Sequence, residues 1–159
     1  MHDSQVINLG GLLSRTSRLF PERLAVIEEE RSWTWKDVDQ RVQAMANALK
    51  ALGLKKGERI LVQSRNNLQL FESCWVAFQM GCVWVPTNFR LTPREVSYLS
   101  TFSGTSAMIY EAGFEKHASK VIQDSRDLKV LIRIGDDQED QYSYESLVES
   151  HLGQKYEIE

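Results

Sequence analysis

Hydrophobic residues recur along this chain in two alternating patterns, one typical of buried strands and one typical of helices. Short apolar runs of strand length lie at residues 59–63, 82–86, 107–110 and 128–134. Between them, apolar residues recur at helical spacing over residues 68–80, 92–103 and 114–123. Strands that alternate with helices in this way form βαβ units. The pattern therefore predicts an α/β fold with a mostly parallel sheet flanked by helices.

The segment before the first of these strands has a different pattern. Asn8 is expected to cap a first helix, which ends at Phe20–Pro21 because the residue before a proline is pushed out of helical conformation. Leu24–Glu28 and Ser32–Thr34 are short runs of strand type separated by a charged turn. They predict a short N-terminal β-hairpin.

Local hydrogen-bonding signals mark the starts and ends of several helices. Thr34 and Asp37 form an approximate capping box for a long helix, and Gly53 suits the left-handed position that ends it. Thr92, a proline and Glu95 form a complete helix start. Ser143 is expected to cap a short last helix.

Composition and charge narrow the class of protein. The 159 residues, with 42% hydrophobic and 26% charged residues, are typical of one globular domain. A net charge of −3 argues against nucleic acid as a partner. There is no apolar run of membrane-spanning length, and Met1–Ser4 lacks the pattern of a secretory signal. A cytoplasmic location is expected.

The chain carries none of the common catalytic or metal-binding motifs. It lacks a Walker-type phosphate loop, a dinucleotide-binding glycine motif, a zinc-protease helix motif and a C-x-x-C pair. Ser103–Ser106 resembles a phosphate loop, but an apolar strand follows at once without a nearby lysine, so a helix C-cap is the better interpretation. His117 borders an apolar helix face without a carboxylate or cysteine partner at catalytic spacing. The sequence therefore predicts no catalytic residue and no metal site here.

The remaining reactive and charged groups favour structural roles. Cys74 and Cys82 lie in apolar segments and are expected to be inert thiols in a reducing compartment. The acidic stretch 136–140 lacks the glycine and the terminal glutamate of a calcium loop, so it is interpreted as solvated surface.

Six segments taken together resemble a known enzyme superfamily. Their residues are Asn8–Ala25, Ser32–Val38, Ala48–Arg59, Ser64–Asn67, Gln79–Asn88 and Leu91–Val96. Each fragment alone is a weak signal. In this order and at this spacing they resemble the N-terminal part of the AMP-forming acyl-CoA synthetase superfamily, in which Trp35 stands for the usual tyrosine of the first core motif.

The resemblance implies a function for a longer parent protein. That parent is an ATP-dependent, AMP-forming ligase that joins a small carboxylic acid, fatty or other acyl, to CoA through an acyl-adenylate and then a thioester. Its ATP, Mg²⁺ and CoA are held mainly by segments that follow in the family. Residues 1–159 are then an incomplete N-terminal subdomain, an inactive scaffold whose partner is the remainder of the parent chain; a homodimer is left open.

Two other functions remain open at this point. The same early motifs occur in adenylation domains that serve a carrier protein instead of CoA. A self-contained, non-catalytic α/β interaction module is the third alternative. The near-continuous apolar strands also predict that the isolated chain exposes an apolar face, because the helices present are too few to cover both sides of the sheet.

One residue is a candidate for ligand binding. The loop Asn88–Leu91 is expected to leave the carboxyl end of a parallel strand, where open α/β sheets bind ligands, and the next helix directs its N-terminal dipole there. In acyl-CoA ligases that resemble this chain, an arginine in a matching Asn-x-Arg-Leu segment approaches the nucleotide phosphates of CoA. The resemblance thus assigns Arg90 to a CoA phosphate. The alternative is structural: Asn88 caps the turn, and Arg90 pairs with a neighbour such as Glu95.

Overall fold

A computed structural model of the chain describes residues 8–138 and 141–157. The N-terminal part consists of α1 (Gly10–Leu19), β1 (Leu24–Glu28), β2 (Arg31–Thr34) and α2 (Trp35–Ala51). The central part alternates strands and helices: β3 (Arg59–Gln63), α3 (Leu68–Met80), β4 (Val83–Pro86), α4 (Pro93–Ser103), β5 (Thr105–Glu111) and α5 (Glu115–Asp124). The chain then forms β6 (Val130–Ile134), β7 (Tyr142–Ser143) and α6 (Tyr144–His151).

The strands form a two-stranded antiparallel hairpin and a five-stranded parallel sheet in the order β4-β3-β5-β6-β7. The predicted fold class is confirmed. The chain runs from β3 outward to β4 and then crosses back to place β5 on the other side of β3. The sequence pattern did not predict β7, because two residues are too few to show an alternation; Tyr142 pairs with Ile132 of β6.

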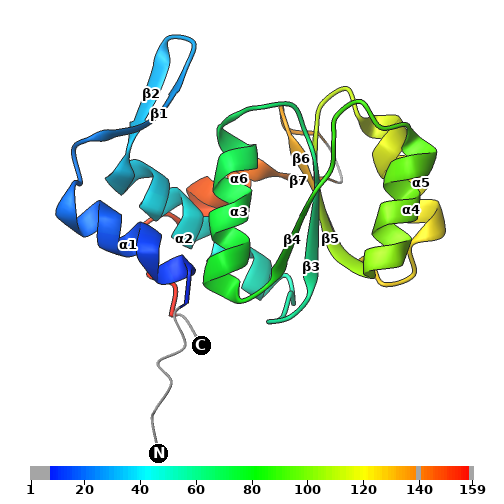
Figure 1. The fold of residues 1–159 in the computed structure, drawn as a ribbon, viewed down its shortest axis with the longest axis horizontal. Coiled ribbons are helices and arrows are strands. Elements are labelled where there is room, and N and C mark those ends of the chain that lie inside the picture. Colours follow the sequence, from blue (N-terminus) through cyan, green and yellow to red (C-terminus); the bar gives the residue numbers. More distant parts are fainter. Residues whose placement is uncertain (1–7, 139–140, 158–159) are drawn as a thin grey trace, which may run out of the picture.

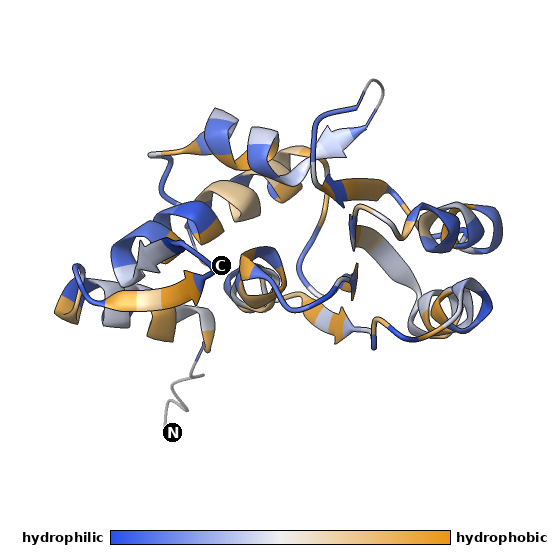
Figure 2. Ribbon diagram, turned by 90° about the horizontal axis from the view of Figure 1, so that it is seen from above, coloured by the Kyte–Doolittle hydropathy of each residue, from blue (hydrophilic) through white to orange (hydrophobic). Residues whose placement is uncertain are grey.

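Helices cover both faces of the sheet (Figure 1). One face packs against α2, α3 and α6, and we call it the α2 face; the other packs against α4 and α5, and we call it the α4 face. Successive residues of a strand point to opposite faces. In β3, Ile60 and Val62 accordingly lie in the core of the α2 face, and Leu61 lies in the core of the α4 face. Figure 2 shows hydrophobic stripes on the helices and hydrophilic residues on their outer sides.

The predicted helix starts are present as hydrogen bonds. At α2, the Thr34 hydroxyl accepts a hydrogen bond from the Asp37 backbone N–H, and the Asp37 carboxylate accepts one from the Thr34 N–H. Thr92 and Glu95 form the same reciprocal pair at α4. Gly53, with a φ of +89°, follows α2 in the left-handed conformation.

The first helix begins one residue later than predicted. Leu9, not Asn8, occupies the N-cap position, and its side chain makes no capping hydrogen bond. The Asn8 Oδ1 atom still accepts a hydrogen bond from the Gly10 N–H at 2.8 Å, so it satisfies one of the free donors. Gly10 is required for packing, because a Cβ atom there would lie 2.6 Å from the Cα atom of Gln79 in α3.

Exposed apolar side chains lie in a different place from the one expected. The strands β3, β5 and β6 are buried on both faces, so the helices present do cover the sheet. The exposed large apolar side chains lie on two regions instead: the α1–β1 segment, with Leu12, Leu19, Phe20, Leu24 and Ile27 among them, and the α4 side of the sheet, with Val83, Tyr98, Phe102 and Ile122 among them. No helix in the described part of the chain is both long and apolar enough to cross a membrane.

Candidate functional site

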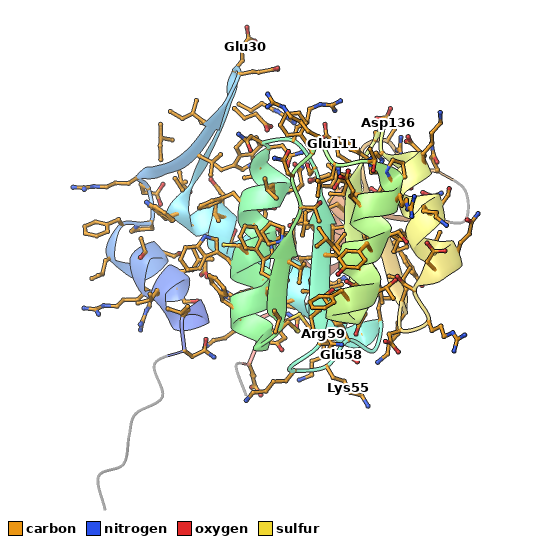
Figure 3. All side chains as sticks on the ribbon, turned by 45° about the vertical axis from the view of Figure 1, so that its right-hand side comes forward. Glu30, Lys55, Glu58, Arg59, Glu111 and Asp136 are labelled. Carbon is orange, nitrogen blue, oxygen red and sulfur yellow. The ribbon has the colours of Figure 1, made fainter. Side chains whose placement is uncertain are left out.

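A cleft of about 840 Å³ opens at the carboxyl end of the sheet. It lies where the chain leaves β3, β5 and β6, and the β1–β2 hairpin and α6 complete its walls. Figure 3 shows Glu111 and Asp136 at this end of the molecule, and Lys55, Glu58 and Arg59 at the opposite end. Because the strand order reverses between β3 and β5, this is the edge at which open α/β sheets bind ligands. We call it the carboxyl cleft.

The carboxyl cleft is acidic. Its lining includes the carboxylates Glu28, Glu29, Glu111, Asp136, Asp137, Glu145 and Glu149, against the guanidinium groups of Arg31 and Arg65. This excess of negative charge disfavours binding of a polyanion such as a nucleoside triphosphate.

A charged network joins β3 and β5 at the rim of the cleft. The Glu111 carboxylate accepts hydrogen bonds from the Arg65 backbone N–H at 2.7 Å and from the Ser64 hydroxyl at 3.1 Å. The Arg65 Nη1 atom lies 3.1 Å from the same carboxylate. Glu111 is therefore occupied by the protein itself.

The hairpin is fixed to the same edge through one carboxylate. Glu28, at the end of β1, accepts a hydrogen bond from the Leu68 N–H, a free donor in the first turn of α3, at 3.2 Å. Arg31 binds the other oxygen of Glu28 at 2.8 Å. The bond to Leu68 fixes the end of β1 to the start of α3, beside the cleft.

A buried ionic cluster lies behind the cleft. The Arg41 guanidinium of α2 binds the Glu72 carboxylate of α3 at 2.6 Å and the Glu145 carboxylate of α6 at 2.8 Å. The Glu72 side chain is fully buried, and burial raises its pKa to about 7 in spite of the attraction to Arg41. The sequence reading missed this cluster. Its signal was that Glu72 is the only charged residue in the apolar helix segment LQLFESCWVAFQM.

The loop that carries Arg90 leaves the carboxyl end of β4, as predicted. It does not line the carboxyl cleft. Asn88 closes the turn, because its Oδ1 atom accepts a hydrogen bond from the Arg90 N–H at 2.9 Å and its carbonyl accepts one from the Leu91 N–H at 3.0 Å. The Arg90 guanidinium lies 5.4 Å from the centre of the Phe89 ring and makes no ion pair with any described residue.

The start of α4 already holds an anion. The Glu95 carboxylate accepts hydrogen bonds from the Thr92 N–H and hydroxyl at 2.7 and 2.8 Å, which lower the pKa of Glu95. The expected pairing of Arg90 with Glu95 is therefore absent among the described contacts. The helix dipole invoked for a ligand at Arg90 is also partly neutralised by Glu95.

The other candidates take structural roles. Gly104 caps α4 in the left-handed conformation with a φ of +65°, at the amino end of the sheet, so Ser103–Gly104 is a helix terminus and Thr105–Ser106 begin β5. The His117 Nε2 atom lies 2.8 Å from the Leu91 carbonyl and fixes α5 to the Arg90 loop. Burial raises the pKa of both cysteine thiols, Cys74 and Cys82. Of the acidic stretch, residues 139–140 lie outside the described part of the chain, and Asp136 and Asp137 are exposed.

A family model described as AMP-binding enzyme matches residues 13–156. The chain belongs to the AMP-binding enzyme family. This match confirms the resemblance to AMP-forming acyl-CoA synthetases that the motifs indicated.

Individual relatives are distant and much longer. The chain is 23% identical over 130 residues to a 3-oxocholest-4-en-26-oate–CoA ligase of Rhodococcus rhodochrous. The matched region covers 82% of this chain and 23% of that protein. It is 32% identical over 114 residues to a fatty acid–[acyl-carrier-protein] ligase of Streptomyces coeruleorubidus. That match covers 72% of this chain and 22% of that protein. The chain thus spans about a quarter of these relatives or less.

The fold agrees with a solved ligase structure. An anthranilate CoA ligase in complex with anthranoyl-AMP superimposes with a TM-score of 0.87 at 20% identity. The matched region covers 96% of this chain and 30% of that structure.

Proposed function

We propose that this chain is the N-terminal part of an ATP-dependent, AMP-forming ligase that activates a small carboxylic acid and transfers it to CoA. The reaction has two half-steps: the acid attacks the α-phosphate of ATP to give an acyl-adenylate and pyrophosphate, and the CoA thiol then displaces AMP. The observation that carries the proposal is the family match over residues 13–156. We also propose that the enzyme is cytoplasmic.

Within that enzyme, this segment acts as scaffold and not as the nucleotide site. The carboxyl cleft has an excess of carboxylates, which repel the phosphates of ATP. Among the described residues, no three His, Cys, Asp or Glu side chains are grouped so as to hold a metal ion. The residues present therefore do not fit Mg²⁺–ATP, and no step of the first half-reaction is assigned to them.

Arg90 is proposed to contact a phosphate of CoA. Its guanidinium is exposed and forms no ion pair within residues 8–138 and 141–157, and Asn88 holds the loop in a fixed turn, so little loop entropy is lost on binding. A guanidinium suits a phosphate because it donates two parallel hydrogen bonds. Glu95 opposes this role electrostatically, which limits the gain expected from the start of α4.

The test is ATP–pyrophosphate exchange, measured with a panel of carboxylic acids on the 159-residue chain and on a ligase chain that continues past it. We expect exchange with the longer chain and none above background with this chain alone. Exchange by this chain, in a preparation free of host ligase, would show that the scaffold assignment is wrong. No exchange by either chain would favour a non-catalytic interaction module.

A carrier protein is the second candidate for the acyl acceptor. The match to a fatty acid–[acyl-carrier-protein] ligase favours it. Thioester formation with CoA and with a phosphopantetheinylated carrier protein, measured side by side after the same adenylation step, distinguishes the two acceptors.

A further inference from the structure

The buried ionic cluster of Arg41, Glu72 and Glu145 joins three helices that are distant in the sequence. Arg41 donates two hydrogen bonds to each carboxylate, at 2.6 and 3.2 Å to Glu72 and at 2.8 and 2.8 Å to Glu145. The solvent exposure of the three side chains rises from Glu72 to Glu145: the side chain of Glu72 is 0% exposed, that of Arg41 is 15% exposed and that of Glu145 is 41% exposed. The Arg41–Glu145 bonds attach α6 to α2 through opposite charges.

The charges of this cluster do not balance when both carboxylates are ionised. One guanidinium then faces two carboxylates, which leaves one excess negative charge in a buried site. Two neutral groups adjoin it: Gln69 of α3 donates a hydrogen bond to Glu145 at 2.7 Å, and the buried Tyr144 hydroxyl faces the Glu72 carboxylate and acts to lower the pKa of Glu72. The other elements packed on α3, namely α1, β3 and β4, give Glu72 no ion pair or hydrogen bond within the described chain.

The electrostatic environments of the two carboxylates differ. Burial raises the pKa of Glu72 to about 7. At Glu145, burial acts in the same direction, but the hydrogen bonds from Arg41 and Gln69 outweigh it and lower the pKa. Arg31 of the hairpin adds to this lowering. Glu72 is thus the group that binds a proton as the pH falls toward neutral, whereas Glu145 stays ionised.

We propose that the Arg41–Glu72–Glu145 cluster is a proton-controlled lock between α6 and the α2–α3 pair. A proton taken from water by a Glu72 carboxyl oxygen leaves Arg41 and Glu145 as one balanced ion pair. Loss of that proton restores the excess negative charge, and the more exposed Glu145 is the carboxylate that can leave the guanidinium for water. Because Glu145 and Gln69 also line the carboxyl cleft, opening the lock loosens one wall of that cleft.

The first test is the pH dependence of unfolding of the whole chain. A carboxyl with a pKa raised on folding binds more protons in the folded state, so stability is highest below the unfolded pKa and falls as the pH rises. Between pH 5 and 7, the unfolding equilibrium constant of the wild type should therefore rise by up to about tenfold per pH unit relative to Glu72→Gln, which mimics the protonated form. Glu149→Gln, an exposed carboxyl of α6, should keep the wild-type profile.

Parallel profiles for the wild type and Glu72→Gln would overturn the proposal. If Glu72→Gln does not fold, the carboxyl carbon of Glu72 can be titrated by NMR in the wild type. A midpoint at about 7 supports the lock, and a midpoint near the ordinary value of 4.5 overturns it.

The second test is specific to α6. At pH 8, the rate of amide hydrogen exchange in α6, divided by the rate in β3 and β5, should be several-fold higher in the wild type than in Glu72→Gln, because an open lock frees α6 without unfolding the sheet. An equal ratio in the two proteins would show that Glu72 affects global stability only, and the lock would be rejected.

Discussion

The two faces of the sheet are stabilised in different ways. Among the described residues, the core of the α2 face contains twenty-three buried hydrophobic residues, and the core of the α4 face contains seven. The α2 face also holds the buried ionic cluster, whereas the Lys120–Asp124 ion pair of α5 lies at the surface. The comparison indicates that the α2 face dominates the stability of the chain.

The α4 face carries an exposed aromatic pair and lies next to the Arg90 loop. Tyr98 and Phe102 are 65% and 79% exposed, and their rings stack with 5.9 Å between the ring centres. The Arg90 loop lies at the carboxyl end of β4, the edge strand of the sheet, just before α4. The α4 face thus combines a small core with an exposed aromatic pair and a nearby cation, and four predictions test how the two faces differ.

The largest effect is expected for Arg41→Met. At pH 8, this change leaves Glu72 ionised and buried without its partner, so the free energy of unfolding should fall by about 3–5 kcal/mol. At pH 5, where Glu72 is neutral, the loss should be smaller. Urea unfolding followed by tryptophan fluorescence measures both.

The matched control on the other face is Lys120→Met, which breaks the exposed pair with Asp124 of α5. The free energy of unfolding should fall much less in this variant than in Arg41→Met, because water replaces the lost partner at a surface site. Equal losses for the two variants would contradict the assignment of stability to the α2 face.

The next effect concerns binding and not stability. In a ligase chain that contains this segment, Arg90→Ala should raise the KM for CoA about tenfold to a hundredfold, which corresponds to the roughly 1.5–3 kcal/mol of a charged hydrogen bond. ATP–pyrophosphate exchange should be unchanged. Arg94→Ala, in the first turn of α4, is the control and should leave the KM for CoA unchanged. An unchanged KM for CoA in Arg90→Ala would mean that Arg90 has a structural role only.

A smaller and equal effect is expected at the two capping boxes. Thr34→Ala at α2 and Thr92→Ala at α4 each remove one N-cap hydrogen bond, so each should reduce the free energy of unfolding by about 1 kcal/mol. Thermal unfolding of both variants under one set of conditions tests this. A clearly larger loss at one cap would mean that the faces already differ at the level of local structure.

The smallest effect on stability is expected for Tyr98→Ser combined with Phe102→Ser. Both side chains are exposed, so the free energy of unfolding should change by less than about 0.5 kcal/mol. Binding of a hydrophobic dye should fall, because this exposed aromatic pair is removed. Ile27→Ser, at an exposed position of the hairpin, is the control and should alter dye binding less.

The sequence determined the features that depend on neighbouring residues. The Thr34–Asp37 and Thr92–Glu95 boxes, the left-handed Gly104 and the turn at Asn88 all form within a few residues. Their hydrogen bonds require no other part of the fold, which is why the sequence predicts them correctly. The alternation of apolar runs likewise determined the parallel sheet.

The tertiary structure decided what depends on distant segments. Arg41 meets Glu72 and Glu145 across 31 and 104 residues, and β7 forms only because β6 offers it an edge. The carboxyl cleft is assembled from loops of three strands, the hairpin and α6. None of these has a local hydrogen-bond or periodicity signal, since burial and pairing arise only after the chain has brought the segments together. The charge balance of the buried cluster was therefore decided by folding, although the lone Glu72 in an apolar helix marked its position in the sequence.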